Sequence, residues 1–191
     1  MPKGIKIKFV SIALVAIIMT FITQSTLSYY TTVGKATNVV TSGNIRFMIN
    51  ERTDSGTEFP KEGVYIMPGD IVSKQVSITS DCSHPFYLRV KLVYGINSSE
   101  LPYEDCFKLN IDENNWQLHD GWYYYKGIVN PFDSTPNVFS HVEIVGSKVD
   151  NSYIGKTLTL TVKADAVQSE NNPVEGTDTY KALGWPREDG V

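Results

Sequence analysis

Regular alternation of apolar and polar residues marks two segments of this chain as half-buried β-strands. In the first segment, 86–94, one face carries Phe86, Leu88, Val90 and Leu92. In the second, 158–167, one face carries Leu158, Leu160, Val162, Ala164 and Ala166. Shorter runs rich in β-branched and aromatic residues predict four more strands, at 45–49, 72–79, 122–129 and 139–145.

Turn-forming residues separate these predicted strands. Gly, Pro, Asn and Asp cluster at 54–56, 67–70, 97–99, 119–121, 130–131 and 150–152. Many short strands with turns between them are typical of two packed antiparallel sheets. The sequence therefore predicts an all-β protein with a single β-sandwich of jelly-roll or immunoglobulin-like type.

The N-terminal segment has the three-part layout of a secretory signal peptide, whose helix is excluded from the fold. Three lysines come first, at 3, 6 and 8, and an apolar run follows at 9–22. Small residues at Thr26 and Ser28 predict cleavage between Ser28 and Tyr29. A permanent anchor is the alternative, but a spanning helix needs about 20 apolar residues and this run is shorter.

The remaining chain divides into three predicted parts. Residues 29–41 form an N-terminal arm that is rich in Tyr, Thr and Val, and residues 42–168 form the β-sandwich. Residues 169–191 are polar and contain three glycines and two prolines. We expect them to form a loose tail in which only Trp185 packs.

Charge narrows the classes of partner. The whole chain has a net charge of −4, and loss of the leader's three lysines leaves 14 basic and 21 acidic residues. An acidic surface argues against nucleic acid and against electrostatic docking to anionic lipid. We expect membrane contact only before cleavage, and a signal peptidase as the partner during export.

The two cysteines, Cys82 and Cys106, both lie in the exported part of the chain. An oxidising compartment permits a disulfide between them, which would contribute about 3 kcal/mol by constraining the unfolded chain. The alternative is a pair of separate, half-buried thiols, and the spacing does not decide between the two.

The residues that catalysis commonly uses do not form a known catalytic motif in this sequence. His84, His119 and His141 are scattered and lack the His-Glu-x-x-His spacing of a zinc protease, and no Gly-x-Ser-x-Gly nucleophile motif is present. The acidic pairs at 104–105 and 112–113 lack the spacing of a calcium loop. We therefore predict no catalytic, metal-binding or cofactor-binding residue, and a protein that is not an enzyme.

Aromatic residues are concentrated at Trp116 and at 122–125, where the sequence reads Trp-Tyr-Tyr-Tyr. Successive strand residues point to opposite faces, so at least one of Tyr123, Tyr124 and Tyr125 must point outward. Packing of these rings is the simpler interpretation. A carbohydrate or protein contact surface is the alternative, and it would make the protein a monomeric surface adhesin.

Six segments together resemble the TasA/camelysin family of Gram-positive bacteria, whose members are exported with a dedicated signal peptidase. They occur in the family's order and cover most of the chain after the leader. They are STLSYY at 25–30, GNIRFMI at 43–49, PGDIVSK at 68–74, FYLRVK at 86–91, GWYYYKG at 121–127 and ADAVQ at 164–168, followed by Asn171.

This resemblance implies a secreted structural protein, a fibre-forming or accessory subunit of a biofilm matrix, located in the extracellular matrix or at the cell surface. It implies self-association, or association with a related matrix protein, through the arm at 29–41, which would add as a β-strand to the next subunit. The arm residues expected to take part are Tyr29, Tyr30, Val33, Val39 and Val40.

The resemblance also carries a rival from another class, because some members are described as cell-surface metalloendopeptidases. The chain departs from the family in two respects. It is shorter than the best-known fibre-forming members, and its two cysteines are not part of the pattern.

Overall fold

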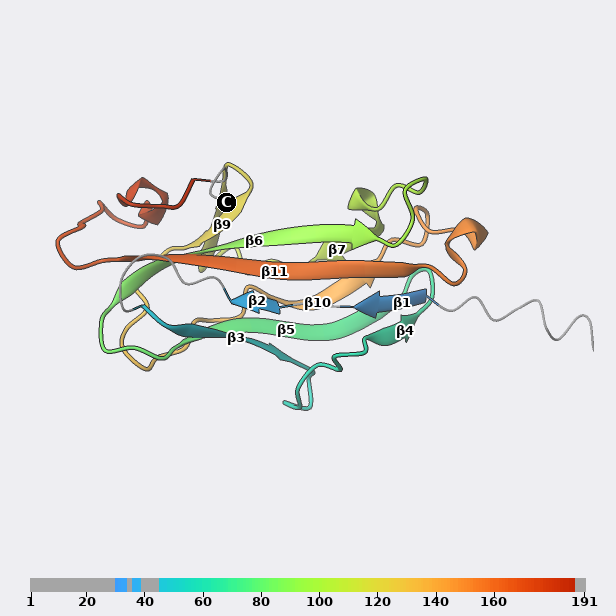
Figure 1. The fold of residues 1–191 in the computed structure, drawn as a ribbon, viewed down its shortest axis with the longest axis horizontal. Helices are drawn as coiled ribbons and strands as arrows, with labels where there is room; N and C mark the ends of the chain where they lie inside the picture. The colour runs from blue at the N-terminus through green and yellow to red at the C-terminus, as the bar shows by residue number, and fades with distance from the viewer. Residues whose placement is uncertain (1–29, 34–35, 39–44, 188–191) are drawn as a thin grey trace, which may run out of the picture.

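The computed structural model of the 191-residue chain describes residues 30–33, 36–38 and 45–187 (Figure 1). The predicted leader and its cleavage bond lie outside these residues. Within the described part, no helix is both long and apolar enough to cross a membrane.

The strands form two sheets that face each other, which confirms the all-β sandwich predicted from the sequence. The larger sheet has the order β4-β1-β11-β6-β9-β8, with β2 also paired to β11, and the smaller has the order β3-β5-β10-β7. The larger sheet consists of β1 (Tyr30–Val33), β2 (Ala36–Asn38), β4 (Val64–Ile66), β6 (Phe86–Ile96), β8 (Trp116–His119), β9 (Trp122–Tyr125) and β11 (Thr157–Gln168). The smaller consists of β3 (Phe47–Arg52), β5 (Ile71–Ser80), β7 (Phe107–Leu109) and β10 (Phe139–Ile144).

The apolar faces predicted for the two longest strands are confirmed. On β6, Phe86, Leu88 and Val90 have no exposed surface, and β11 buries its whole predicted apolar row. These two strands pair antiparallel over eleven residues, from Leu158–Ile96 to Gln168–Phe86. Their length and continuous pairing make them the centre of the larger sheet, as Figure 1 shows.

Aromatic contacts join the two sheets at both ends of the sandwich. The rings of Phe47 on β3 and Phe86 on β6 have centroids 6.2 Å apart. At the opposite end, Tyr94 on β6 stacks on Phe107 of β7 at 5.1 Å. Aromatic pairs at these separations stabilise a core beyond the area that they bury.

Helical structure in the described residues consists of three single turns of 3-10 helix, η1 (Glu104–Cys106), η2 (Asn151–Tyr153) and η3 (Thr179–Lys181). Several strands are only three or four residues long. Among these, β4, β7 and β8 lie outside every segment predicted to be a strand, because so short a run carries too few alternations to be recognised.

The segment after Gln168 differs from the prediction of a loose tail. It folds back over the outer face of the larger sheet, where Val174, Ala182 and Trp185 pack with Tyr87 and Val167. Trp185 packs as predicted, but Thr179 and Ala182 are buried as well. Tyr87 on β6 and Val167 on β11 lie on the faces of these strands opposite to the predicted apolar rows, and the C-terminal segment packs against them.

Candidate assembly site

The described residues of the predicted arm, 30–33 and 36–38, lie beside β11 and run parallel to it. In β1, Thr31, Thr32 and Val33 are the Cα partners of Thr157, Leu158 and Thr159. In β2, the partners of Ala36, Thr37 and Asn38 are Val162, Lys163 and Ala164. The offset between partners is the same in both strands, so β1 and β2 occupy one continuous row along β11.

The arm is an inserted strand at its beginning, because β4 pairs with its other side. Tyr30, Thr31 and Thr32 are the antiparallel partners of Ile66, Tyr65 and Val64. β1 therefore has β11 on one side and β4 on the other. Within the described residues, β4 is connected to the rest of the larger sheet only by its pairing with β1. We call this position between β4 and β11 the arm seat.

The walls of the arm seat are apolar. Ile66 on β4, the partner of Tyr30, is 1% exposed, and Leu158 on β11, the partner of Thr32, is fully buried. A strand that leaves this position would uncover both this apolar surface and the unpaired amide and carbonyl groups of β11.

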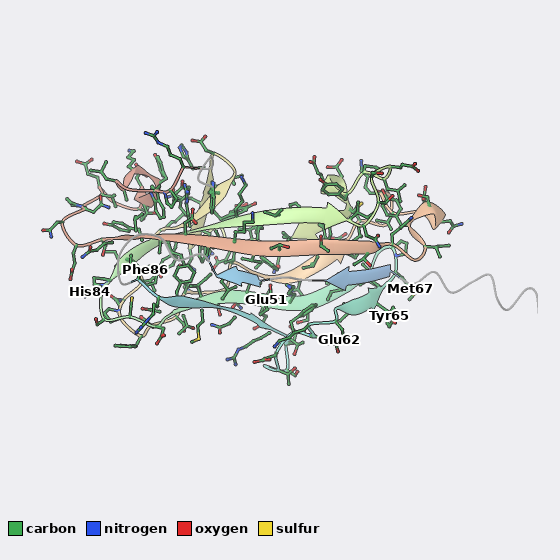
Figure 2. All side chains as sticks on the ribbon, in the orientation of Figure 1. Glu51, Glu62, Tyr65, Met67, His84 and Phe86 are labelled. Carbon is green, nitrogen blue, oxygen red and sulfur yellow. The ribbon has the colours of Figure 1, made fainter. Side chains whose placement is uncertain are left out.

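A buried ion pair lies on the smaller sheet near the arm. β2 contacts β3, which carries Glu51, and Figure 2 places Glu51 in the middle of the sandwich. Lys74 Nζ is 2.9 Å from Glu51 Oε2 and 4.3 Å from the centre of the Phe59 ring. The Lys74 side chain is 1% exposed, and this burial lowers the pKa of the lysine although Glu51 acts to raise it.

The sequence missed this pair, although one signal was available. Lys74 has the same strand phase as Val76 and Ile78, both fully buried residues of β5. A lysine in phase with two core residues has to point into the sandwich.

The predicted arm residues are placed as follows. Tyr30 and Val33 lie in β1, at the two ends of its four residues. Tyr29, Val39 and Val40, like the predicted cleavage residue Ser28, lie outside the described residues.

The two cysteines are free thiols, as in the second alternative, but both are buried and not half-buried. Cys82 lies in the turn before β6, with its Sγ 3.3 Å from the carbonyl oxygen of His84. Cys106 lies in η1 beyond the other end of β6, with its Sγ 3.5 Å from the Pro102 carbonyl oxygen. A strand of eleven residues spans roughly 35 Å, whereas a disulfide needs Cα atoms within about 7 Å.

The three histidines lie in three separate surroundings. His84 Nδ1 lies 3.5 Å from Glu170 Oε2, His119 Nε2 lies 3.2 Å from Asp120 Oδ2, and His141 Nε2 lies 4.0 Å from Asp54 Oδ1. In the described part of the chain, no three His, Cys, Asp or Glu side chains gather into a group that could hold a metal ion.

The aromatic run at 122–125 divides between the two faces of β9. Tyr123 and Tyr125 pack against the main core, while Trp122 and Tyr124 lie on the outer face. Both outer rings are buried, because Tyr180 and Trp185 of the C-terminal segment lie against Tyr124 and the Arg89 guanidinium lies over Trp122. Trp185 meets Tyr124 edge-on with ring centroids 5.3 Å apart. The face on which the adhesin alternative depends is therefore covered by the chain itself.

Arg89 is the centre of this covered face. Its guanidinium lies 4.0 Å from the Trp122 ring and 5.0 Å from the Trp185 ring. It donates to Asp165 through Nη2 at 2.7 Å and to the carbonyl oxygen of Pro186 at 2.6 Å. One buried arginine thus joins β6, β11 and the C-terminal segment.

A scan against protein-family models, a search of curated proteins and a search of solved structures each gave no significant match to this chain.

Proposed function

We propose that this chain is an exported structural protein that assembles with copies of itself, or with a related matrix protein, by exchanging its N-terminal arm. The observation that carries the proposal is the place of β1, which belongs to the predicted N-terminal arm and is inserted between β4 and β11. A strand from another copy can satisfy the same backbone groups and cover the same apolar walls.

Several further features support this function. The signal peptide predicted at 1–28 would place the protein outside the cell, and its predicted cleavage bond lies one residue before β1. One of the segments that resemble the TasA/camelysin family, 164–168, forms the end of β11, the strand along which the arm pairs. A fibre-forming or accessory subunit of a biofilm matrix is the function that joins these features.

The register of the arm gives a direct test. Thr31 and Thr157 are Cα partners on neighbouring strands, and such Cα atoms lie about 5 Å apart, within the range of a disulfide. Thr31→Cys is placed in one chain and Thr157→Cys in another, both in a Cys82→Ala, Cys106→Ala background. The two chains are mixed and oxidised. If arms are exchanged, we expect a disulfide between the two chains.

The matched control pairs Thr31→Cys with Thr161→Cys, which is four residues further along β11 and out of register. This pair should form no disulfide between chains. A mixture of Thr31→Cys and Thr157→Cys chains that stays uncrosslinked at every concentration, while the double variant within one chain closes readily, would overturn the proposal.

A further inference from the structure

The turn at Asn130–Asp133 holds a phenylalanine in a conformation that its side chain disfavours. The Asp133 amide donates to the Asn130 carbonyl at 3.2 Å, which closes a four-residue turn with Pro131 and Phe132 in the middle. Phe132 has a φ of +60°. Proline suits the second position of such a turn, but the third position with positive φ is normally taken by glycine or asparagine.

Burial of the Phe132 ring does not offset this backbone strain. The side chain is 70% exposed at the tip of the turn. Backbone strain is unfavourable in an isolated subunit, and strained residues cluster at functional positions. A second exposed apolar residue lies near the turn, since Met48 is 49% exposed and its partner Thr79 bridges to Ser134, two residues after Phe132.

This turn lies at the end of the sandwich toward which the arm runs. β11 runs parallel to the arm and ends at Gln168, which pairs with Phe86, and Phe86 in turn bridges to Val129. Figure 2 shows Phe86 and His84 at this end, and Tyr65 and Met67, which lie in and just after β4, at the opposite end.

β3 also begins at this end of the sandwich. The Asp81 amide donates to the Arg46 carbonyl, and Ser80, the partner of Phe47, donates its amide to the Asp133 carbonyl. The start of β3 is therefore a neighbour of the turn that carries Phe132.

Chain length fixes how far apart two copies can be when an arm is exchanged. In an exchanged pair, β2 of the donor ends at Asn38 beside β11 of the acceptor, and Ile45 of the same chain lies in the donor's own body. Seven residue steps span at most about 25 Å. The start of β3 in the donor must therefore lie within about 25 Å of the place where the donor's arm leaves the acceptor.

We infer that the turn at Asn130–Asp133, with Phe132 at its tip, is the contact between the bodies of two copies joined by arm exchange. The second copy is the occupant because arm exchange brings this end of the donor toward this end of the acceptor. The inference rests on the proposed function and adds a second surface to it, independent of the arm seat. Phenylalanine is enriched in protein interfaces, and a few central side chains carry most of the binding energy of a contact.

The test uses the Thr31→Cys and Thr157→Cys chains, full length and exported by a bacterial host, with Phe132→Gly added to both. We expect the concentration that gives half-maximal crosslinking between chains to rise by about tenfold or more. The Tm should not fall, and relief of the positive φ should raise it by roughly 2–4 °C. Phe132→Asn, which also tolerates positive φ, should behave in the same way.

The control is Ile154→Asn, because Ile154 is 51% exposed in the loop before β11 at the other end of the sandwich. It should leave the crosslinking curve unchanged. Equal crosslinking in the parent pair and in the pair that carries Phe132→Gly would overturn the body contact while arm exchange stands. Absence of crosslinking even in the parent pair would overturn the proposed function and this inference with it.

Discussion

Arg89 and Asp165 are Cα partners on β6 and β11, and the Arg89 guanidinium donates to one Asp165 oxygen through both Nε, at 3.0 Å, and Nη2, at 2.7 Å. Their side chains are 7% and 8% exposed, on the outer face of a sheet that would be open to solvent without the C-terminal segment. The segment after Gln168 is therefore needed for burial of this pair.

We expect Arg89→Met to destabilise the protein by about 3–5 kcal/mol, because it leaves the Asp165 carboxylate buried without a cation. Urea unfolding measures the loss. The double variant Arg89→Met, Asp165→Leu should recover a large part of it. A double variant that is as unstable as the sum of both single variants would contradict the assignment of a coupled pair.

Removal of one partner of the Lys74–Glu51 pair, which lies inside the sandwich, should likewise lower the free energy of unfolding. Lys74→Met is expected to cost about 3–5 kcal/mol, since Glu51 then stays in the interior without its partner. Replacement of both residues by Met and Leu should be near neutral. Lys163→Met, at an exposed position of β11, is the control and should change the unfolding free energy by less than about 0.5 kcal/mol.

Alkaline pH should destabilise the protein through Tyr94. Burial, with a smaller effect of Tyr123, raises the pKa of Tyr94 to about 12 from an ordinary value near 10. The folded state therefore holds the phenolic proton more tightly than the unfolded state. The stability that this provides is complete below pH 10 and is lost as the pH rises from 10 to 12.

Tyr94→Phe should remove this part of the pH dependence. Stability measured by urea unfolding across pH 10 to 12 should fall less steeply in the variant than in the parent. Identical slopes would contradict the pKa shift of Tyr94.

The two thiols should be present but protected. Cys82 is 4% exposed and Cys106 is 2% exposed, so we expect slow alkylation of the native protein and two alkylated cysteines per chain after unfolding without a reductant. Mass spectrometry reads the result. Labelling that requires a reductant would indicate a disulfide and contradict the placement of the two residues.

A proline in the arm should weaken the pairing of β1 with β4 and β11. Thr32 is paired with Leu158 on one side and with Val64 on the other. Thr32→Pro removes an amide from this ladder, and we expect a loss of about 1–3 kcal/mol of unfolding free energy. Ser99→Pro, in the exposed loop after β6, is the matched control and should cost less.

Much of the fold was predictable from local pattern. The six predicted strands correspond to β3, β5, β6, β9, β10 and β11, and the apolar rows of β6 and β11 are the ones that are buried. The prediction for 122–129 was too long, since β9 ends at Tyr125. β4 was missed because three residues carry no period, and its role as a wall of the seat depends on the arm that pairs with it.

The candidate site was predictable only in part. The sequence identified the arm as a segment able to form a strand, but it contained no information about register or partner. Cys82 and Cys106 illustrate the same limit, because their separation depends on the strand between them and on the direction of that strand.

The sequence by itself determined which residues alternate, where the turns fall and that the protein is built from strands, since these follow from the preferences of neighbouring residues. Only the tertiary structure decided that the arm inserts between β4 and β11, that Lys74 meets Glu51 and that Phe132 lies at the end toward which the arm runs. Each of these relationships joins residues far apart in the chain. They depend on how two sheets pack, and short-range pattern cannot specify that packing.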